Sequence, residues 1–233
     1  MFEQMARQAM RPDPLMSDPL LNPSAPGARG PSYVVGLDLG QAQDFSALCV
    51  VERTVAPDPA DPARAVRHFG VRALRRWRLG TPYTEVVEDV RALLSKPPLP
   101  GCPLVIDGTG VGSAVVEMFA KARLTARLVP VTITAGGQLG AAEHTPGKGW
   151  RVPKKDLVGV MQTLVQFERL QIAPGLAEAA TLARELKMFR VKVTALGNET
   201  FEAWRTRDHD DLVLSVALAC WWGQKGDKRP CVG

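Results

Sequence analysis

The chain has 233 residues, 45% of them hydrophobic, which is enough for one substantial core or two small ones. No apolar run approaches the ~20 residues that a membrane-spanning helix needs, and the N-terminus lacks the pattern of a signal peptide, so we expect a cytoplasmic protein with no membrane partner. The net charge of +5 and the isoelectric point of about 9.2 favour a polyanionic partner without identifying one. The four cysteines are far apart and form no CxxC pair, so buried or free thiols are expected rather than a zinc site or disulfides.

Proline and apolar patterning divide the chain into three parts. Residues 1–32 contain six prolines with glycine and serine between them, and such a segment sustains neither a helix nor a central strand, so we interpret it as a tail or linker. Residues 33–224 show regular apolar patterns and are predicted to form one folded domain. Residues 225–233 are predicted to be a flexible C-terminal tail.

The first half of this domain is predicted to be rich in strands. Two valine- and leucine-rich segments separated by "GQAQD" indicate an antiparallel hairpin, and the short apolar run "PLVID" is typical of a strand buried on both faces. The glycines of "GTGVG" lead from that strand into a helix. The predicted strands cover 33–39, 45–52, 66–79 and 103–107, and the predicted helices cover 81–96 and 113–121.

The second half is predicted to be mostly helical. Its glycine-rich loop is interpreted as a mobile flap or a long disordered connection, and the pair Gly197-Asn198 in an alternating segment indicates a hairpin. The expected elements are a strand over 126–133, the loop over 135–149, helices over 153–170 and 176–187, a hairpin over 189–204 and a buried helix over 210–222. The second of these helices is expected to bury Leu176, Ala180, Ala183 and Leu186. The order predicts an α/β fold with helices on a central mixed sheet.

Acidic residues stand at unusual places in these elements. Asp38 lies in an apolar strand, where no helix end is present to stabilise its charge. Asp107 ends the strand "PLVID" just before a glycine-rich turn, a position at which α/β sheets commonly build their sites. A third group, "RDHDD", places Asp210 and Asp211 directly before the last helix. Carboxylates in such places are costly if they stay unpaired.

Each acid also has a purely structural explanation. Asp208 or Asp210 could cap the last helix, and Asp107 could start a turn. For Asp38 this kind of explanation is the weakest. Taken together, the acids favour a hard divalent cation with oxygen ligands, Mg²⁺ or Mn²⁺ rather than zinc. Two such ions about 4 Å apart can activate a water and stabilise the leaving oxygen in phosphodiester cleavage.

Three segments in order, "GLDLGQAQDFSA", "VIDGTGVGSAVVEMF" and "HDDLVLSVALA", resemble the nuclease domain of bacteriophage terminase large subunits. The resemblance covers about residues 33–223. It implies a ribonuclease H-like fold and metal-dependent endonuclease cleavage of double-stranded DNA during genome packaging, in the cytoplasm of a bacterial host. The hairpin expected over 189–204 is also similar to one found in that family.

The resemblance implies roles for particular residues. Asp38 matches the first-strand acid and Asp107 the second, while Asp211 matches the late acid, with Asp210 as a co-ligand or alternate. Asp44 matches a recurrent acid of the first motif or caps the second strand. His209 is a candidate ligand, proton shuttle or part of a helix cap.

Basic residues supply candidate DNA contacts, although ordinary solvated side chains explain them equally well. Lys154 and Lys155 begin a helix, where the dipole disfavours cations unless a phosphate approaches. The other candidates are Lys148, Arg205 and Arg207.

The chain also departs from the terminase pattern. It contains no GxxxxGK[ST] phosphate loop for the family's ATPase motor. Either it is a nuclease module of a longer protein or a free-standing relative, and a packaging ATPase domain or a portal are the partners that the resemblance implies.

Three alternatives to a terminase nuclease remain open. A Holliday-junction-resolvase-like enzyme has the same fold and similar acids but usually needs a dimer. An actin-like sugar kinase or ATPase contains similar "DLG" and "DGTG" loops but requires a duplicated domain and a longer chain. A DNA-binding module that has lost catalysis would keep the basic surface without metal-dependent cleavage.

Overall fold

The computed structural model describes residues 32–40, 44–58, 61–110, 112–134, 141–195 and 210–225. Within these ranges no helix combines the length and the apolar character needed to cross a membrane. The strands found there are β1 (Ser32–Asp38), β2 (Ala47–Asp58), β3 (Asp61–Arg76), β4 (Pro103–Asp107), β5 (Arg127–Thr134), β6 (Glu143–Thr145), β7 (Gly149–Pro153) and β8 (Leu170–Ile172).

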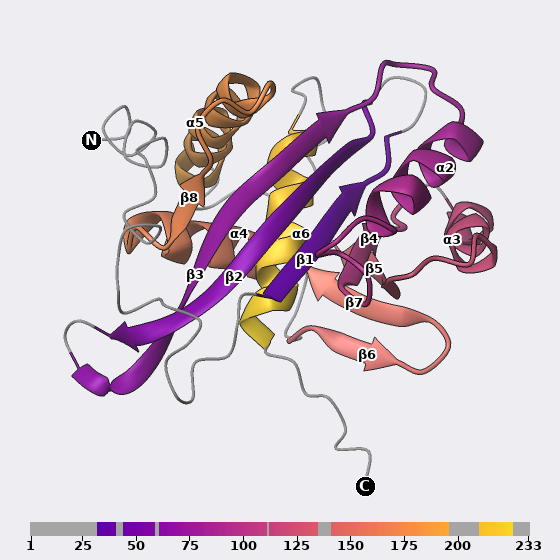
Figure 1. Cartoon of the computed structure of the whole chain (residues 1–233). Helices are drawn as coiled ribbons and strands as arrows, with labels where there is room; N and C mark the ends of the chain where they lie inside the picture. Colours follow the sequence, from indigo (N-terminus) through magenta and orange to yellow (C-terminus); the bar gives the residue numbers. More distant parts are fainter. Residues whose placement is uncertain are drawn as a thin grey trace, which may run out of the picture.

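These strands form one mixed sheet in the order β6-β7-β5-β4-β1-β2-β3-β8 (Figure 1). The strands β1, β4, β5 and β7 run parallel to one another, whereas β2 is antiparallel to both β1 and β3. The helices are α2 (Tyr83–Leu94), α3 (Gly112–Lys121), α4 (Lys154–Gln166), α5 (Ala179–Ala195) and α6 (Asp211–Lys225). The predicted α/β architecture, a central mixed sheet flanked by helices, is confirmed.

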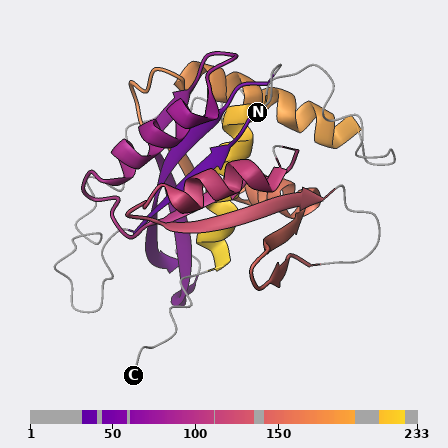
Figure 2. The same cartoon turned by 90° about the vertical axis from the view of Figure 1, so that its right-hand side faces the viewer.

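One face of the sheet packs against α2 and α3, which lie together in Figure 2. Successive strand residues point to opposite faces, so Val35 and Leu37 of β1 face these two helices. The helix α2 contributes its predicted apolar face, and Val86, Val90 and Leu94 are fully buried there.

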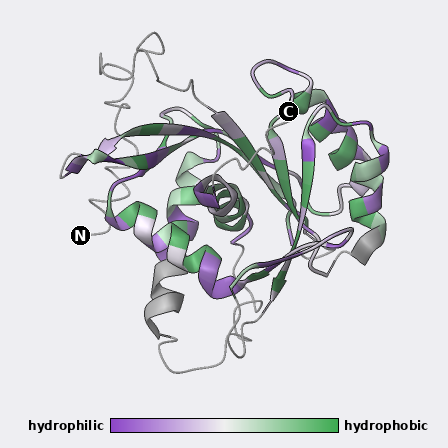
Figure 3. Cartoon of the chain, turned by 90° about the horizontal axis from the view of Figure 1, so that it is seen from below, coloured by the Kyte–Doolittle hydropathy of each residue, from purple (hydrophilic) through white to green (hydrophobic). Residues whose placement is uncertain are grey.

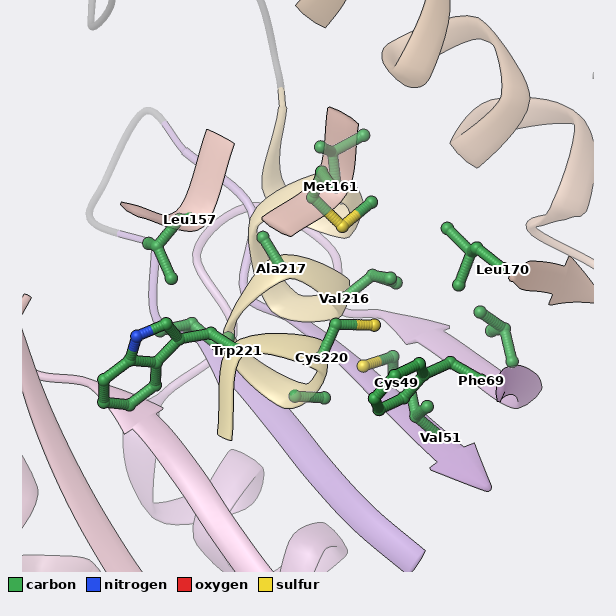
Figure 4. Close-up of a cluster of buried hydrophobic side chains, with 14 of the residues drawn as sticks. Cys49, Val51, Phe69, Leu157, Met161, Leu170, Val216, Ala217, Cys220 and Trp221 are labelled. Carbon is green, nitrogen blue, oxygen red and sulfur yellow. The ribbon is translucent and has the colours of Figure 1, made fainter. Parts of the chain in front are cut away.

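The other face carries α6, which is buried along nearly its whole length. Figure 3 shows this helix almost end-on, coloured mainly as hydrophobic. Its core neighbours come from β1–β3 and α4, and Figure 4 shows Met161, Val216 and Phe69 packed in this layer. Cys49 and Cys220 also lie here as free thiols (Figure 4), and burial raises the pKa of Cys49 to about 12.

The backbone of α6 lies unusually close to β1 at Gly36. A Cβ atom placed on Gly36 would be only 2.0 Å from the backbone oxygen of Ser215 and 3.2 Å from the Cβ of Ala219. Such a Cβ would overlap the helix backbone, which cannot rotate away as a side chain can. Glycine at this position therefore lets the helix rest directly on the strand.

The structure corrects several sequence predictions in the second half. The predicted helix over 153–170 ends at Gln166, and Leu170 already belongs to β8. In the predicted loop over 135–149, residues 143–145 form β6 and Gly149 begins β7. The hairpin predicted from residue 189 is wrong up to Ala195, where α5 continues instead; the rest of that hairpin lies outside the described residues.

The buried face of α5 also differs from the prediction. Ala179, Leu182 and Glu185 are buried, whereas Ala180 is exposed. The prediction is confirmed in part, because Leu176 and Leu186 are partly buried against the core. The buried face is rotated relative to the predicted one, so that it includes a glutamate. This rotation brings Glu185 towards the start of α6.

Candidate active site

Side-chain alternation places Asp38 and Asp107 on the face of the sheet that α6 covers. Asp38 follows Val34 and Gly36 at two-residue intervals, and both of these lie against α6 or its core layer. Asp107 likewise follows Val105 of the same layer. The register pairs Leu37 with Ile106, so the two acids end adjacent parallel strands at the same level.

The first residues of α6 complete the acidic group. Asp211 is the first residue of this helix and is only 5% exposed, compared with 9% for Asp38 and 6% for Asp107. Asp210 directly precedes the helix, and its backbone oxygen accepts the N–H of Leu214 at 2.9 Å. Residues that are more than 170 positions apart in the chain, Asp38 and Asp211, are thus brought to one end of the sheet.

Electrostatic interactions connect Asp38 to the other acids of this group. Burial raises the pKa of Asp38 well above its usual value, and repulsion from Asp107, Asp211, Asp210 and Asp44 raises it further. A buried carboxylate surrounded by like charges is unfavourable in its ionised form. A positive charge close to Asp38 would therefore stabilise its ionised form.

Arg76 supplies a positive charge beside Asp211. It ends β3 and is level with Asp38, because Asp38 pairs with Ala47 and Ala47 pairs with Arg76. Its Nη2 donates to Oδ2 of Asp211 at 3.1 Å, in a pair whose side chains are 15% and 6% exposed. The guanidinium also lies over the ring of Phe45, 3.7 Å from the ring centroid.

Glu185 of α5 holds the start of α6 from the side. Its Oε2 accepts the backbone N–H groups of Leu212 and Val213 at 3.0 and 3.1 Å. Burial raises the pKa of Glu185 to about 7, with a further contribution from Asp211. Two of the N–H groups that a helix leaves unpaired at its start are therefore bound by a distant carboxyl group.

Asp107 combines a structural role with its place in the acidic group. Its Oδ1 accepts the N–H of Thr109 at 2.8 Å, which is the turn that the sequence left open as an alternative. The hydroxyl of Thr109 in turn accepts the N–H of Ile133 at 2.7 Å. The loop after β4 is thereby tied to β5, and the Asp107 carboxylate is held in place.

The acidic group provides oxygen donors for a hard cation, although its members are not drawn together around one point. In the part of the chain that the structure describes, no three carboxylate, histidine or cysteine side chains form a closed set for a single ion. The donor chemistry nevertheless fits a divalent cation, because an oxygen-rich group with excess negative charge favours Mg²⁺, Mn²⁺ or Ca²⁺.

The other candidate residues fall into three groups. Asp44 is exposed but close enough to affect the pKa of Asp38. Lys154 and Lys155 begin α4 directly after β7, beyond the carboxyl ends of the parallel strands, whereas Lys148 lies in the turn before β7. The remaining candidates, His209, Arg205 and Arg207, lie outside the described residues.

Sequence reasoning missed Arg76 and Glu185. The sequence held a weak indication of the position of Arg76. Two-residue alternation from Leu74 places Arg76 on the α6 side of β3, and β3 pairs with β2, the neighbour of β1. The sequence held no such indication for Glu185, since one glutamate among several in a helix is usually exposed.

The metal-free protein is expected to become less stable as the pH rises from about 5 to 8. The folded chain holds protons on Asp38 and Glu185 more tightly than the unfolded chain does, because both pKa values are raised. This stabilisation is complete below the ordinary carboxyl pKa and is lost as the pH passes the folded-state value, about 7 for Glu185. Thermal unfolding in EDTA across this range tests it, and Glu185→Gln should flatten the curve. A midpoint that rises with pH would contradict this expectation.

Comparison with known proteins shows what this fold resembles. No protein-family model and no curated protein sequence matches the chain. Among solved structures, a K428A mutant of the large terminase subunit fragment gp2c from bacteriophage Sf6, with calcium, matches with a TM-score of 0.57 and 11% identity over 93% of this chain and 96% of that one. The nuclease domain of the same Sf6 subunit, gp2, matches with a TM-score of 0.55 and 10% identity over the same shares.

A third similar structure is the large terminase nuclease from the thermophilic phage G20c. It is 22% identical, with a TM-score of 0.48 and coverage of 81% of both chains. The two Sf6 structures show that the chain has the fold of that terminase nuclease domain.

Proposed function

We propose that this chain, whose fold is that of terminase nuclease domains, is a metal-dependent endonuclease that cleaves double-stranded DNA in viral genome packaging. The observation that carries the proposal is the grouping of Asp38, Asp107, Asp210 and Asp211 at one end of the sheet, where burial and then their repulsion raise the pKa of Asp38. An acidic group of this kind is unfavourable by itself. It becomes favourable when divalent cations neutralise it.

The residues that would hold the cations are Asp38, Asp107 and Asp211, with Asp210 as a further ligand and Asp44 and His209 as accessory candidates. Carboxylate oxygens without sulfur ligands suit Mg²⁺ or Mn²⁺. Two bound ions would supply an activated water and stabilisation of the leaving oxygen of the phosphodiester.

The chain's own residues would prepare the site for this chemistry. Asp107 is oriented by the N–H of Thr109, and Asp211 by Arg76. The burial of all three principal acids limits the access of water, so that electrostatic interactions there are stronger than in solvent. These features keep the ligands in place before substrate arrives.

The DNA backbone would be held by basic residues around the site. Among the candidates that the structure describes, Lys154 and Lys155 are placed best, because they follow β7 at the end of the sheet where the strands carrying the acids also end. Lys148, Arg205 and Arg207 are further candidates. Loss of one phosphate contact should weaken binding for all sequences and reduce its salt dependence.

The proposal includes the chain's organisation and setting. Residues 1–32 would act as a linker or tail, residues 33–224 as the nuclease domain and residues 225–233 as a C-terminal tail. The implied partners are a packaging ATPase domain or a portal, in the cytoplasm of an infected bacterium.

Incubation of supercoiled plasmid with the purified chain tests the function directly. The wild-type protein is expected to cut the plasmid in Mn²⁺ or Mg²⁺ and not in EDTA. The Asp107→Ala protein is expected to cut it under none of these three conditions. The structural reason is that Asp107 ends β4 beside Asp38, so the substitution removes a proposed ligand and its bond to Thr109 but leaves the apolar core intact. Cutting that persists in EDTA, or in the Asp107→Ala protein, would refute the proposal. A four-way junction assayed beside the plasmid separates a resolvase-like activity from simple duplex cleavage.

A further inference from the structure

Arg76 and Glu185 approach the Asp211 segment from two elements that are far apart in sequence. Arg76 ends β3 and donates to the Asp211 carboxylate at 3.1 Å. Glu185 lies in α5 and accepts the N–H groups of the two residues after Asp211, at 3.0 and 3.1 Å. Asp211 is thus fixed both through its side chain and through the backbone that follows it.

The network is buried and incompletely satisfied. Glu185 and Asp211 are each 5% exposed, and burying such charges is costly unless every polar atom has a partner. Within the described ranges, Oε1 of Glu185 and Nε of Arg76 are buried atoms without a hydrogen-bond partner. A helix start that needed only a cap could use a serine or aspartate of its own at lower cost.

We propose that Arg76 and Glu185 are positioning residues for the cation site. Glu185 sets the place of the α6 start, and Arg76 is an internal cation that keeps the Asp211 carboxylate oriented until a divalent cation binds there. This inference rests on the proposed function and specifies how the same site is regulated.

The two residues should influence cation binding in opposite directions. A divalent cation at Asp211 lies close to the Arg76 guanidinium, and two positive charges at one carboxylate repel each other. Arg76 therefore competes with the metal. Glu185 supports it, because its carboxyl group holds the backbone from which Asp211 projects.

Calorimetric titration of the full chain with Mn²⁺, without DNA, tests this directly. Arg76→Gln is expected to bind Mn²⁺ about fivefold more tightly, because a competing charge is removed. Glu185→Ala is expected to bind it about tenfold more weakly, as happens when the partner of a metal ligand is lost. Glu185→Gln keeps an oxygen acceptor for the α6 N–H groups and should restore most of the lost affinity.

Arg72→Gln is the matched control for Arg76. Arg72 lies on the same strand and pairs with Glu52 at the same distance of 3.1 Å, with side chains 22% and 16% exposed. Its partner Glu52 does not belong to the acidic group, whereas the partner of Arg76 is Asp211. Its replacement should cost a similar small amount of stability while leaving the Mn²⁺ affinity at the wild-type value.

Cleavage provides a second measurement. The Mn²⁺ concentration for half-maximal cutting should fall for Arg76→Gln and rise for Glu185→Ala, while KM for DNA stays unchanged. Wild-type Mn²⁺ affinity in folded Arg76→Gln and in folded Glu185→Ala, with no shift in half-maximal Mn²⁺, would overturn this inference and leave the proposed function standing. A wild-type protein that neither binds Mn²⁺ nor cuts DNA would overturn the proposed function, and this inference with it.

Discussion

Replacing Asp38 by asparagine is expected to abolish DNA cleavage and to make the metal-free protein more stable to heat. The loss of activity follows from removing a charged ligand, which costs several kcal/mol of transition-state stabilisation, or about three orders of magnitude in rate. The gain in stability has a different cause. Burial and the surrounding aspartates disfavour the ionised Asp38, and asparagine has the same shape without the charge.

Unfolding midpoints in EDTA and in Mn²⁺, together with cleavage rates, measure both effects. Mn²⁺ should raise the midpoint of the wild type and have little effect on Asp38→Asn. The control is Asp58→Asn. Asp58 lies on the β2–β3 hairpin, outside the acidic group, and forms an ion pair with Arg169 at 3.8 Å. That variant should lose a little stability and cut at the normal rate. An Asp38→Asn protein that is less stable than the wild type without metal would show that the charge at this position is structural.

Replacing Gly36 by alanine is expected to destabilise the protein by about 3 kcal/mol, at the upper end of the usual cost of overpacking. The new methyl group would overlap the backbone oxygen of Ser215, which is 2.0 Å from the Cβ position. Relief requires α6 to move away from β1, and both core clusters adjoin these elements. For a chain of this size the unfolding midpoint should fall by about 6–12 °C.

Gly159→Ala provides the control for this prediction. Gly159 lies inside α4, and a Cβ there would have no atom within 4 Å. Because alanine favours a helix interior over glycine, the midpoint should stay level or rise by the equivalent of about 0.5–1 kcal/mol. If both substitutions changed the unfolding midpoint equally, the close contact between Gly36 and α6 would not explain the effect of Gly36→Ala.

The two predictions meet in α6. The same helix fills the core beneath the sheet and carries Asp211 at its first residue. A shift of α6 caused by Gly36→Ala should therefore also reduce cleavage in the protein that remains folded, even though Gly36 lies outside the acidic group. Close packing makes this coupling possible, because a packed interior transmits displacements rather than absorbing them.

The acids of β1 and β4 could be found from the sequence because local rules apply to them. A charged residue at the end of an apolar strand is conspicuous, and two-residue alternation places Asp38 on the same face as Val34 and Gly36. The final apolar helix and the acids before it were equally visible. The DNA contacts proposed at Lys154 and Lys155 remain predictions, since only their place at the start of α4 is established.

Local patterns failed where long-range packing decides the structure. The segment after residue 188 alternates and favours a strand by propensity, yet its first part continues α5. Propensity is a weak preference that tertiary contacts override. The short strands β6, β7 and β8 were missed for a related reason: they have three to five residues and are defined by their partner strands.

Periodicity and the cost of a charge in an apolar element were enough to predict the α/β class, most of the longer strands and helices, and four aspartates as site candidates. Which charges meet depends on how these elements pack. Arg76 reaches Asp211 because β3 lies two strands from β1, and Glu185 reaches the start of α6 because α5 packs beside it. Such contacts join positions far apart in the chain, and no local pattern specifies them. Their energies depend on distance and burial, which exist only once the chain has folded.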